Sequence, residues 1–423
     1  MPTAIILLLL SAAPSDPVAT NQHPNVVMIV GDDMAWTDYG FAGHPHVKTP
    51  NLDRLAADGA LFPNAYVPTS LCRASLATLL TGMYAHQHKI CCNDPPKGVD
   101  RSLMLPFLRD APTIPRLLQQ RDYLSLQTGK FWEGPFSNGG FTHGMTKTGR
   151  HGEEGLAIGR QTMQPVYDFI TESKNKLFFV WYAPMMPHQP HNPPERILKK
   201  YTVAGRDVRQ AKYWAMCEWF DETCGDLLKW LDDHKLTDNT LVVYVVDNGW
   251  IQSTGPTQPG EQFLTRSKNT PYDAGVRTPV ILRWPGRIKP GRHDGLVSTI
   301  DLAPTILTAC GVKPSEKMPG VNLIDVASGA KPLRREAVFG EIYTHDCVEL
   351  GKPVLSVTHR WVRQGDWKLI VPTKGELSSE LFNLVADPHE KQNLAESNSD
   401  RVKQLGQLLD GWWKLEGGVA AVR

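Results

Sequence analysis

Three uninterrupted apolar runs of β-prone residues constrain most strongly what this chain can fold into. They occupy residues 25–31, 177–182 and 241–246. A strand that is apolar along its whole length is buried on both faces, which is typical of a sheet covered by helices. Helical patterns lie between the runs. The alternation of the two patterns predicts an α/β sandwich.

Two helical segments have readable ends or faces. Residues 49–59 begin with a capping Thr and a Pro and stop at a Gly, which predicts a helix over this range. Residues 207–234 repeat apolar side chains on one helical face. Cys217 and Cys224 on that face lie about 10.5 Å apart along the helix axis, which is too far for a mutual disulfide. The face comprises Tyr213, Cys217, Phe220, Cys224, Leu227 and Leu231.

The chain changes character after about residue 335. Residues 360–371 predict a β-hairpin with its turn at 364–366, and residues 400–416 predict a terminal helix. We therefore expect a main α/β domain over residues 20–335 and a small C-terminal α+β domain over residues 336–423.

The first residues predict a secretory signal peptide over residues 1–19. An apolar run at residues 4–10 precedes small residues at 11–13, as in the apolar core and cleavage region of a signal. The alternative is a disordered or buried apolar tail. The run is shorter than the about 20 apolar residues that span a bilayer, and no later segment is apolar enough for a membrane span. We expect an exported protein, periplasmic, secreted or at the cell surface.

The charge balance argues against one broad class of function. Lys and Arg number 45, Asp and Glu number 44, and the net charge is +1. A chain of this kind lacks the basic excess that drives bulk binding to nucleic acid or to an acidic membrane surface. We therefore expect no nucleic-acid partner.

Oxygen-bearing side chains follow two of the apolar runs. Asp32 and Asp33 come after the first run, and Asp247 and Asn248 come after the third. The carboxyl ends of parallel strands open onto one crevice, where ligands bind. Four oxygen donors without neighbouring Cys or His suit a hard cation, Ca²⁺ or Mg²⁺. The alternative is two ordinary strand-end turns with capping acids, and the metal interpretation requires that the two strands be neighbours.

Cys72 stands at the predicted start of a helix that ends at Gly82. Free N–H groups and the dipole at a helix N-terminus favour anions and lower the pKa of a thiol. The alternative is a small buried Cys that opens a core helix.

Taken in order along the chain, these motifs resemble the formylglycine-dependent sulfatases of the alkaline-phosphatase-like superfamily. The resemblance implies a large mixed, mostly parallel sheet sandwiched by helices, with a smaller C-terminal α+β domain. It also implies a sulfuric ester hydrolase that acts on a sulfate ester of a carbohydrate. Besides residues 25–33, the matching segments are 49–56, 72–82, 128–130, 183–188, 246–249, 268–279, 301–305 and 380–388.

The resemblance implies roles for individual residues. In this family a maturation enzyme, the formylglycine-generating enzyme, oxidises the motif Cys to formylglycine, whose hydrated aldehyde attacks the sulfur of the ester. Lys130 and Lys268 would contact sulfate oxygens, and His188 would protonate or bind the leaving alcohol. His191 is the alternative to His188, and His143 is expected to line the site. The implied ligands of a Ca²⁺ ion, with Mg²⁺ as the alternative, are Asp32, Asp33, Cys72, Asp247 and Asn248.

The chain departs from the family motif at three positions. Ala74 stands where the family has Pro, Leu76 where it has Arg, and Trp132 where it has His. One cation and one acid–base group are therefore absent from their expected places. We hypothesise that Arg73, next to Cys72, supplies part of the missing charge and contacts the substrate.

Two other functions are compatible with these residues. One is a phosphodiesterase or phosphonate hydrolase of the same superfamily. The other is a catalytically inactive homologue that binds sulfated glycans, which the missing Arg and His would favour.

Overall fold

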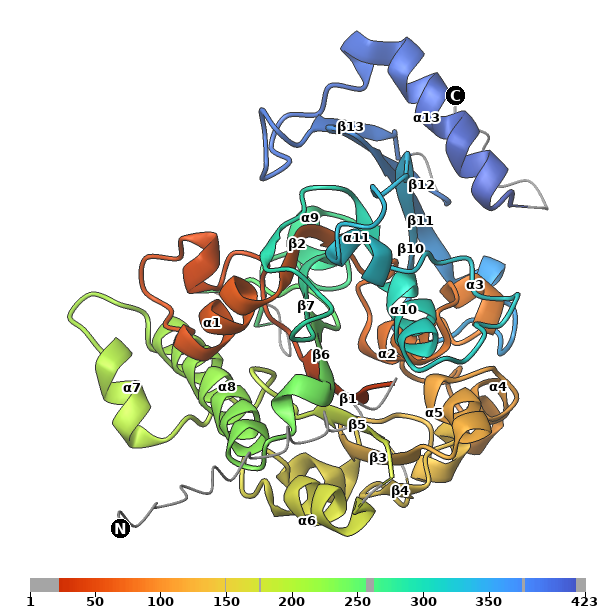
Figure 1. Cartoon of the computed structure of the whole chain (residues 1–423). Coiled ribbons are helices and arrows are strands. Elements are labelled where there is room, and N and C mark those ends of the chain that lie inside the picture. The colour runs from red at the N-terminus through yellow and green to blue at the C-terminus, as the bar shows by residue number, and fades with distance from the viewer. Residues whose placement is uncertain (1–22, 149, 175, 256–261, 375–376, 416–423) are drawn as a thin grey trace, which may run out of the picture.

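The structure is a computed structural model that describes residues 23–148, 150–174, 176–255, 262–374 and 377–415. The predicted signal peptide at residues 1–19 lies outside these residues. A large sheet runs through the centre of the molecule, and a smaller sheet with the last helix lies at one end (Figure 1).

The large sheet is mixed and mostly parallel, as predicted. Its strand order is β4-β3-β5-β1-β6-β7-β2-β8, and β9 pairs with β2. Only β7 runs antiparallel to its neighbours β6 and β2 in this arrangement. The strands are β1 (Asn25–Gly31), β2 (Ala60–Tyr66), β3 (Leu124–Gly129), β4 (His143–Gly144), β5 (Phe178–Ala183), β6 (Thr240–Val246), β7 (Arg277–Arg283), β8 (Gly291–Arg292) and β9 (Val297–Ser298).

Helices connect the strands and cover both faces of the large sheet (Figure 1). The α-helices are α1 (Pro50–Asp58), α2 (Cys72–Thr81), α3 (Ala85–His88), α4 (Pro106–Arg109), α5 (Ile114–Leu118), α6 (Gln164–Ser173), α7 (Glu195–Tyr201), α8 (Val208–Asp233), α9 (Asp273–Val276), α10 (Leu302–Ala309), α11 (Ile324–Ala327), α12 (Pro353–Ser356) and α13 (Ser399–Trp412). Short 3₁₀ turns occupy η1 (Gly40–Ala42), η2 (Arg101–Met104), η3 (Gln119–Arg121), η4 (Phe136–Gly139), η5 (Glu153–Ala157), η6 (Thr237–Asn239), η7 (Thr299–Asp301) and η8 (Glu396–Asn398).

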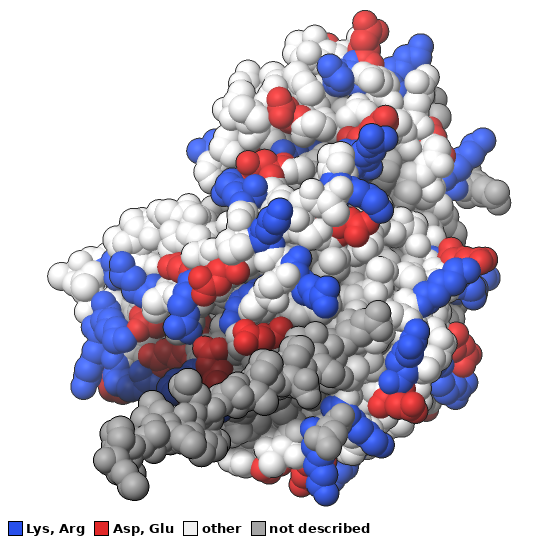
Figure 2. Space-filling model, in the orientation of Figure 1, with Lys and Arg blue, Asp and Glu red and all other residues white. Residues whose placement is uncertain are grey.

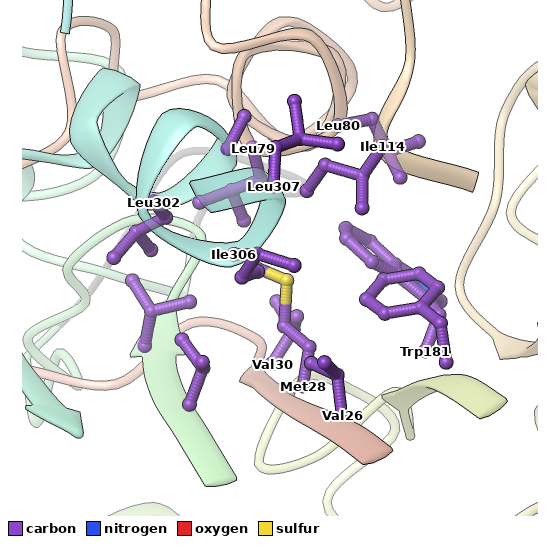
Figure 3. Close-up of a cluster of buried hydrophobic side chains, with 14 of the residues drawn as sticks. Val26, Met28, Val30, Leu79, Leu80, Ile114, Trp181, Leu302, Ile306 and Leu307 are labelled. Carbon is purple, nitrogen blue, oxygen red and sulfur yellow. The ribbon is translucent and has the colours of Figure 1, made fainter. Parts of the chain in front are cut away.

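Alternate residues of β1 feed two separate cores. Val26, Met28 and Val30 pack with α2, α5 and α10 on one face (Figure 3), and Val27 and Ile29 pack with α1, α6 and α8 on the other. Both faces of the strand are therefore buried, which explains why its sequence is apolar without alternation.

The predicted strands and helices are confirmed at the positions that matter for the site. The three apolar runs form β1, β5 and β6, and β1 lies between the other two in parallel register. The first predicted helix is α1. All six residues assigned to the apolar face of α8 are buried: Tyr213, Cys217, Phe220, Cys224, Leu227 and Leu231.

The C-terminal segment forms a four-stranded antiparallel sheet covered by α13. The predicted hairpin is β11 and β12, joined through Gly365, whose φ of 56° is the left-handed conformation that Gly adopts easily. The terminal helix ends at Trp412, before the predicted 416. The proposed domain boundary at residue 336 falls just before β10. The strands are β10 (Ala337–Tyr343), β11 (Val357–Gln364), β12 (Trp367–Pro372) and β13 (Glu380–Asn383).

A buried ionic cluster joins the two sheets. The Nζ of Lys368 on β12 lies 2.8 Å from Asp273 Oδ1 on α9 and 3.0 Å from Glu390 Oε1. All three side chains are buried, so each charge depends on the others for its solvation. The cluster therefore fixes the smaller sheet against the large one.

Charges of both signs are interspersed over the face of the molecule shown in Figure 2. This distribution agrees with the net charge of +1. Within the described ranges, no helix is long and apolar enough to cross a bilayer.

Candidate active site

The four predicted oxygen donors meet at the carboxyl ends of β1 and β6. These strands pair in parallel up to Gly31 and Val246, so the residues that follow them leave the sheet side by side. The backbone N–H of Asp33 donates to Asp247 Oδ1 at 3.2 Å, and Asn248 Nδ2 donates to Asp33 Oδ1 at 2.6 Å. Asp33 has a left-handed φ of 64°, which turns its carboxylate away from the strand direction.

Cys72 reaches this cluster from α2. Its Sγ lies 3.5 Å from Asn248 Oδ1, and its ligand atom lies within 4.8 Å of those of Asp32, Asp33 and His188. The side chain of Cys72 is 2% exposed. The structure thus brings together the first residue of a helix and the ends of two strands that are distant in sequence.

The helix start does not lower the pKa of the Cys72 thiol, contrary to the prediction. Burial raises this pKa to about 12 and outweighs the positive charges of Lys130 and Lys268. The unmodified thiol therefore stays protonated at neutral pH, and it is a poor nucleophile in that form.

Two lysines complete the cluster. Lys130 follows β3, and its Nζ lies 2.6 Å from Asp32 Oδ1 and 3.7 Å from Asp247 Oδ2. Lys268 donates to Asp33 Oδ1 at 2.6 Å and to Oδ2 at 2.7 Å. Burial alone would lower the pKa of each lysine, but the adjacent carboxylates raise both above the ordinary value. Both ammonium groups therefore stay charged.

The pKa values of Asp33 and Asp247 shift in opposite directions in this cluster. Burial alone would raise the pKa of Asp33, but Lys268, His188 and Lys130 together hold it below its ordinary value. Burial and the neighbouring Asp32 raise the pKa of Asp247 well above its ordinary value. Asp247 is therefore the carboxyl group that most lacks a compensating positive charge.

The donor set fits a hard divalent cation. Among the described residues, Asp32 Oδ2 and Asp247 Oδ2 are buried oxygens without a hydrogen-bond partner. A buried carboxylate oxygen without a partner is costly, and coordination to a cation would satisfy it. Carboxylate and amide oxygens are also the ligands that Ca²⁺ and Mg²⁺ prefer.

A hollow of about 620 Å³ adjoins the cluster. His188 links the two, because its Nε2 lies 3.4 Å from Asp33 Oδ2 while its Nδ1 donates to the carbonyl of Gln189 at 2.7 Å. Burial lowers the pKa of His188. The hollow is lined by His151, Met185, His188, Gln189, Pro190, His191, Arg209, Lys212 and Gln262.

Two of the lining residues carry positive charge. Arg209 is paired with Asp207 at 3.0 Å, and Lys212 lies one turn further along α8. His191, predicted as the alternative to His188, also lines the hollow, and burial lowers its pKa to about 4. Asp207 balances the charge of Arg209, so Lys212 supplies the uncompensated positive charge among the described lining residues.

His151 is a residue of the hollow that the sequence analysis missed. Its ring packs edge-on against Trp132 at a centroid distance of 4.2 Å and lies 6.1 Å from the ring of His188. The N–H of Phe131 donates to its carbonyl at 3.3 Å, which holds its loop against the end of β3. His151 lies in a polar loop and belongs to no motif. Only folding brings it beside Trp132, the residue that stands where the family has a His.

Arg73 points away from the cluster and does not line the hollow, so the predicted contact with substrate is corrected. Its guanidinium forms a bidentate ion pair with Glu133, with Nε to Oε1 at 2.6 Å and Nη2 to Oε2 at 2.8 Å. It also donates to the carbonyls of Cys92 and Met104. The side chain is 1% exposed, because α2 is buried on all sides and directs its second residue into the scaffold.

Replacing Arg73 by Ala is expected to destabilise the protein by about 3–5 kcal/mol, because it leaves the buried Glu133 carboxylate unpaired. Chemical denaturation measures this loss. The double variant Arg73→Met with Glu133→Leu should recover most of the stability. An unchanged denaturation midpoint together with a weakened KM would instead support the original charge-supply hypothesis.

His143 also lies away from the site, contrary to the prediction. It is exposed on the edge strand β4, where its Nδ1 lies 2.9 Å from Thr142 Oγ1. Its ring rests against Phe169 of α6 at 5.2 Å. His143 is the first residue of this two-residue strand, and one side of its ring stays exposed at the edge of the sheet.

Comparison with protein families gives two matches. A family model described as Sulfatase matches residues 24–312, and one described as N-sulphoglucosamine sulphohydrolase, C-terminal, matches residues 263–411. Among curated proteins, N-acetylgalactosamine-6-sulfatase of Canis lupus familiaris is 29% identical and the match covers 86% of this chain and 76% of the relative. Arylsulfatase A of Homo sapiens is 27% identical over 98% of this chain and 87% of the relative.

Solved structures share the fold. The complex of BT4656 with its substrate D-glucosamine-2-N,6-O-disulfate has a TM-score of 0.76 at 21% identity and covers 93% of this chain and 98% of the other. The phosphonate monoester hydrolase of Agrobacterium radiobacter has a TM-score of 0.71 at 18% identity and covers 91% of this chain and 94% of the other. At this identity the fold by itself does not distinguish sulfate from phosphonate chemistry.

Proposed function

The chain belongs to the sulfatase family, and from this premise we propose that it hydrolyses sulfate esters of carbohydrates. The reaction would use a bound Ca²⁺ and a formylglycine that is made from Cys72. One observation carries the proposal. Cys72 lies within 4.8 Å of the buried carboxylates Asp32 and Asp33, and two charged lysines face the same carboxylates.

The residues that would hold the cation are Asp32, Asp33, Asp247, Asn248 and the modified Cys72. A hard cation bound there supplies positive charge to the sulfate oxygens and to the attacking oxygen. Formylglycine in its hydrated form supplies an oxygen nucleophile, which the protonated thiol of Cys72 does not. Conversion of Cys72 requires a formylglycine-generating enzyme as a partner, despite Ala74 and Leu76 in the motif.

The two lysines would bind the sulfate group. Lys130 follows β3, Lys268 lies in the segment between β6 and α9, and both keep their charge when buried. Preorganised charges in a buried site stabilise the charge that develops on sulfate oxygens in the transition state.

His188 would handle the proton of the leaving alcohol. The carbonyl of Gln189 accepts a hydrogen bond from its Nδ1, which leaves Nε2 directed toward Asp33 and the hollow. In the neutral ring Nε2 would accept a hydrogen bond from a sugar hydroxyl. A second proton at Nε2, which the charges of Asp32 and Asp33 favour, would be the one given to the oxygen of the departing sugar.

The hollow favours an anionic sugar as the rest of the substrate. Lys212 and Arg209 line it beside three histidines. Asp207 balances Arg209, so Lys212 would be the positive partner of a carboxylate or a second sulfate on the sugar. A sulfated glycan that carries further negative charge is therefore the proposed substrate class.

Parallel assays test the reaction class. We expect turnover of aryl sulfate and of sulfated monosaccharides, and much slower turnover of the matching aryl phosphodiester and phosphonate monoester. The reverse preference would identify a phosphodiesterase or phosphonate hydrolase. Glycan binding without turnover, in a preparation whose Cys72 is fully converted, would identify an inactive binding homologue.

His151 is expected to contribute to turnover. Replacement of His151 by Ala should lower kcat by about 10²-fold, because the neutral imidazole can both donate to and accept from a hydroxyl of the bound sugar. Steady-state kinetics on a sulfated sugar measure the effect. His143→Ala is the matched control and should leave kcat unchanged. Equal kinetics of the two variants would remove His151 from the site.

The proposed place of action is outside the cytoplasm. The signal peptide predicted at residues 1–19 and the family's substrates support export. N-terminal sequencing of the protein from its culture medium or periplasm tests it.

A further inference from the structure

Three buried thiols from distant parts of the chain converge outside the site described above. Cys91 and Cys92 follow α3, and Cys347 lies between β10 and α12. Their sulfur atoms lie within 4.8 Å of one another, and the sulfurs of Cys91 and Cys92 are 3.6 Å apart. The proposed sulfatase reaction makes no use of them.

The separations match those around a single soft cation. With metal–sulfur bonds of about 2.3 Å, two thiolates on a tetrahedral or trigonal cation stand about 3.8–4.0 Å apart. A disulfide would join two of the three sulfurs and leave the third without a partner. One cation can hold all three.

All three residues are enclosed by the protein. Cys91 and Cys92 are 1% and 0% exposed, and Cys347 is 7% exposed. Cys347 is therefore the least buried of the three residues.

We propose that Cys91, Cys92 and Cys347 form a binding site for one soft d¹⁰ cation of the Zn²⁺ or Cu(I) class. Thiolate ligands select such cations over Ca²⁺ and Mg²⁺. The trithiol site is thus chemically distinct from the oxygen-rich cluster around Asp32.

The trithiol site joins the C-terminal subdomain to the segment at Asn93 and Asp94, which contacts the start of α2. Asn93 N donates to His345 O at 3.0 Å, and Cys347 N donates to Asp94 O at 2.9 Å. The side chain of Asn93 also accepts from the N–H of Arg73 at 3.0 Å, at the start of α2. A bound cation would therefore brace the first turn of α2, which carries Cys72.

Cadmium binding tests the proposal, because Cd²⁺–thiolate charge transfer absorbs in the ultraviolet. The protein carries Cys72→Ala, which removes the thiol beside the oxygen donors, and it is reduced, desalted under nitrogen and kept in excess Ca²⁺. We expect one Cd²⁺ per chain with the charge-transfer band, displacement by Zn²⁺, and a melting temperature raised by about 5 °C.

Variants in the same background assign the ligands. Cys347→Ser should abolish the band and weaken Cd²⁺ binding by about 10²-fold or more. If this variant does not fold, Cys92→Ala is used in its place and should have the same effect. Cys217→Ala, which removes a buried thiol of α8, is the control and should keep the band.

Two results would overturn the proposal. One is the absence of the band in a folded, fully reduced sample. The other is a peptide in which Cys347 is joined to Cys91 or Cys92 by a disulfide in protein isolated without reductant. Neither result bears on sulfate ester hydrolysis, which is measured separately.

Discussion

Replacement of Cys72 by Ala is expected to lower kcat for a sulfate ester by about 10⁵-fold, the scale found when a covalent nucleophile is removed. Cys72 is the residue that places a side chain at the meeting point of Asp32, Asp33 and His188. Alanine leaves α2 and the surrounding core in place but supplies no oxygen for attack. Steady-state and single-turnover kinetics measure the loss.

The matched control is Cys217→Ala, which removes a buried thiol from α8 and should change kcat less than about twofold. Mass spectrometry of the peptide that contains Cys72 accompanies the kinetics. We expect an aldehyde in place of the thiol in active protein from a host with the maturation machinery. Active protein with an intact thiol at Cys72 would contradict the proposed nucleophile.

Replacement of Asp32 by Ala is expected to lower kcat/KM by about 10³-fold or more and the affinity for Ca²⁺ by about 10²-fold or more. One carboxylate oxygen of Asp32 is buried and has no hydrogen-bond partner in the described part of the chain, and the other accepts from Lys130. The variant therefore removes a cation ligand and leaves a lysine without its counter-charge. Calcium titration calorimetry on the purified variant separates this loss from any loss of folding.

The control for Asp32 is Asp221→Asn. Asp221 is also a buried carboxylate, but it accepts from Leu52 N at 2.8 Å and from Asn51 Nδ2 at 2.8 Å at the start of α1. Its replacement should lower the denaturation midpoint and leave Ca²⁺ affinity unchanged. Equal Ca²⁺ affinity of Asp32→Ala and the parent protein would place the cation elsewhere or exclude it from this cluster.

The strands that form the centre of the fold could be predicted because their signal is local. Burial on both faces leaves residues 25–31 and 241–246 apolar throughout, and this pattern needs no knowledge of neighbours. The position of the donors after each strand is local as well. Local sequence does not show that these donors converge, because the pairing of β1 with β6 depends on contacts between segments more than 200 residues apart.

Local sequence does not predict which side chains point into the site. Arg73 is adjacent to Cys72, yet one helical step turns its guanidinium away from the cluster toward Glu133. His143 follows the site residue Lys130 in the same part of the sequence but lies on an exposed edge strand. His151 carries no motif and still reaches the hollow. Sequence proximity does not report which way a side chain points when its partners come from other segments.

The apolar strands, the helix that begins at Cys72 and the oxygen donors after β1 and β6 can be read from local sequence, because each is a property of a short stretch of chain. Tertiary structure decided which charges face the cluster, which histidines share the hollow and which thiols meet. These outcomes depend on distances between remote segments, which are set by the packing of helices on both faces of the sheet.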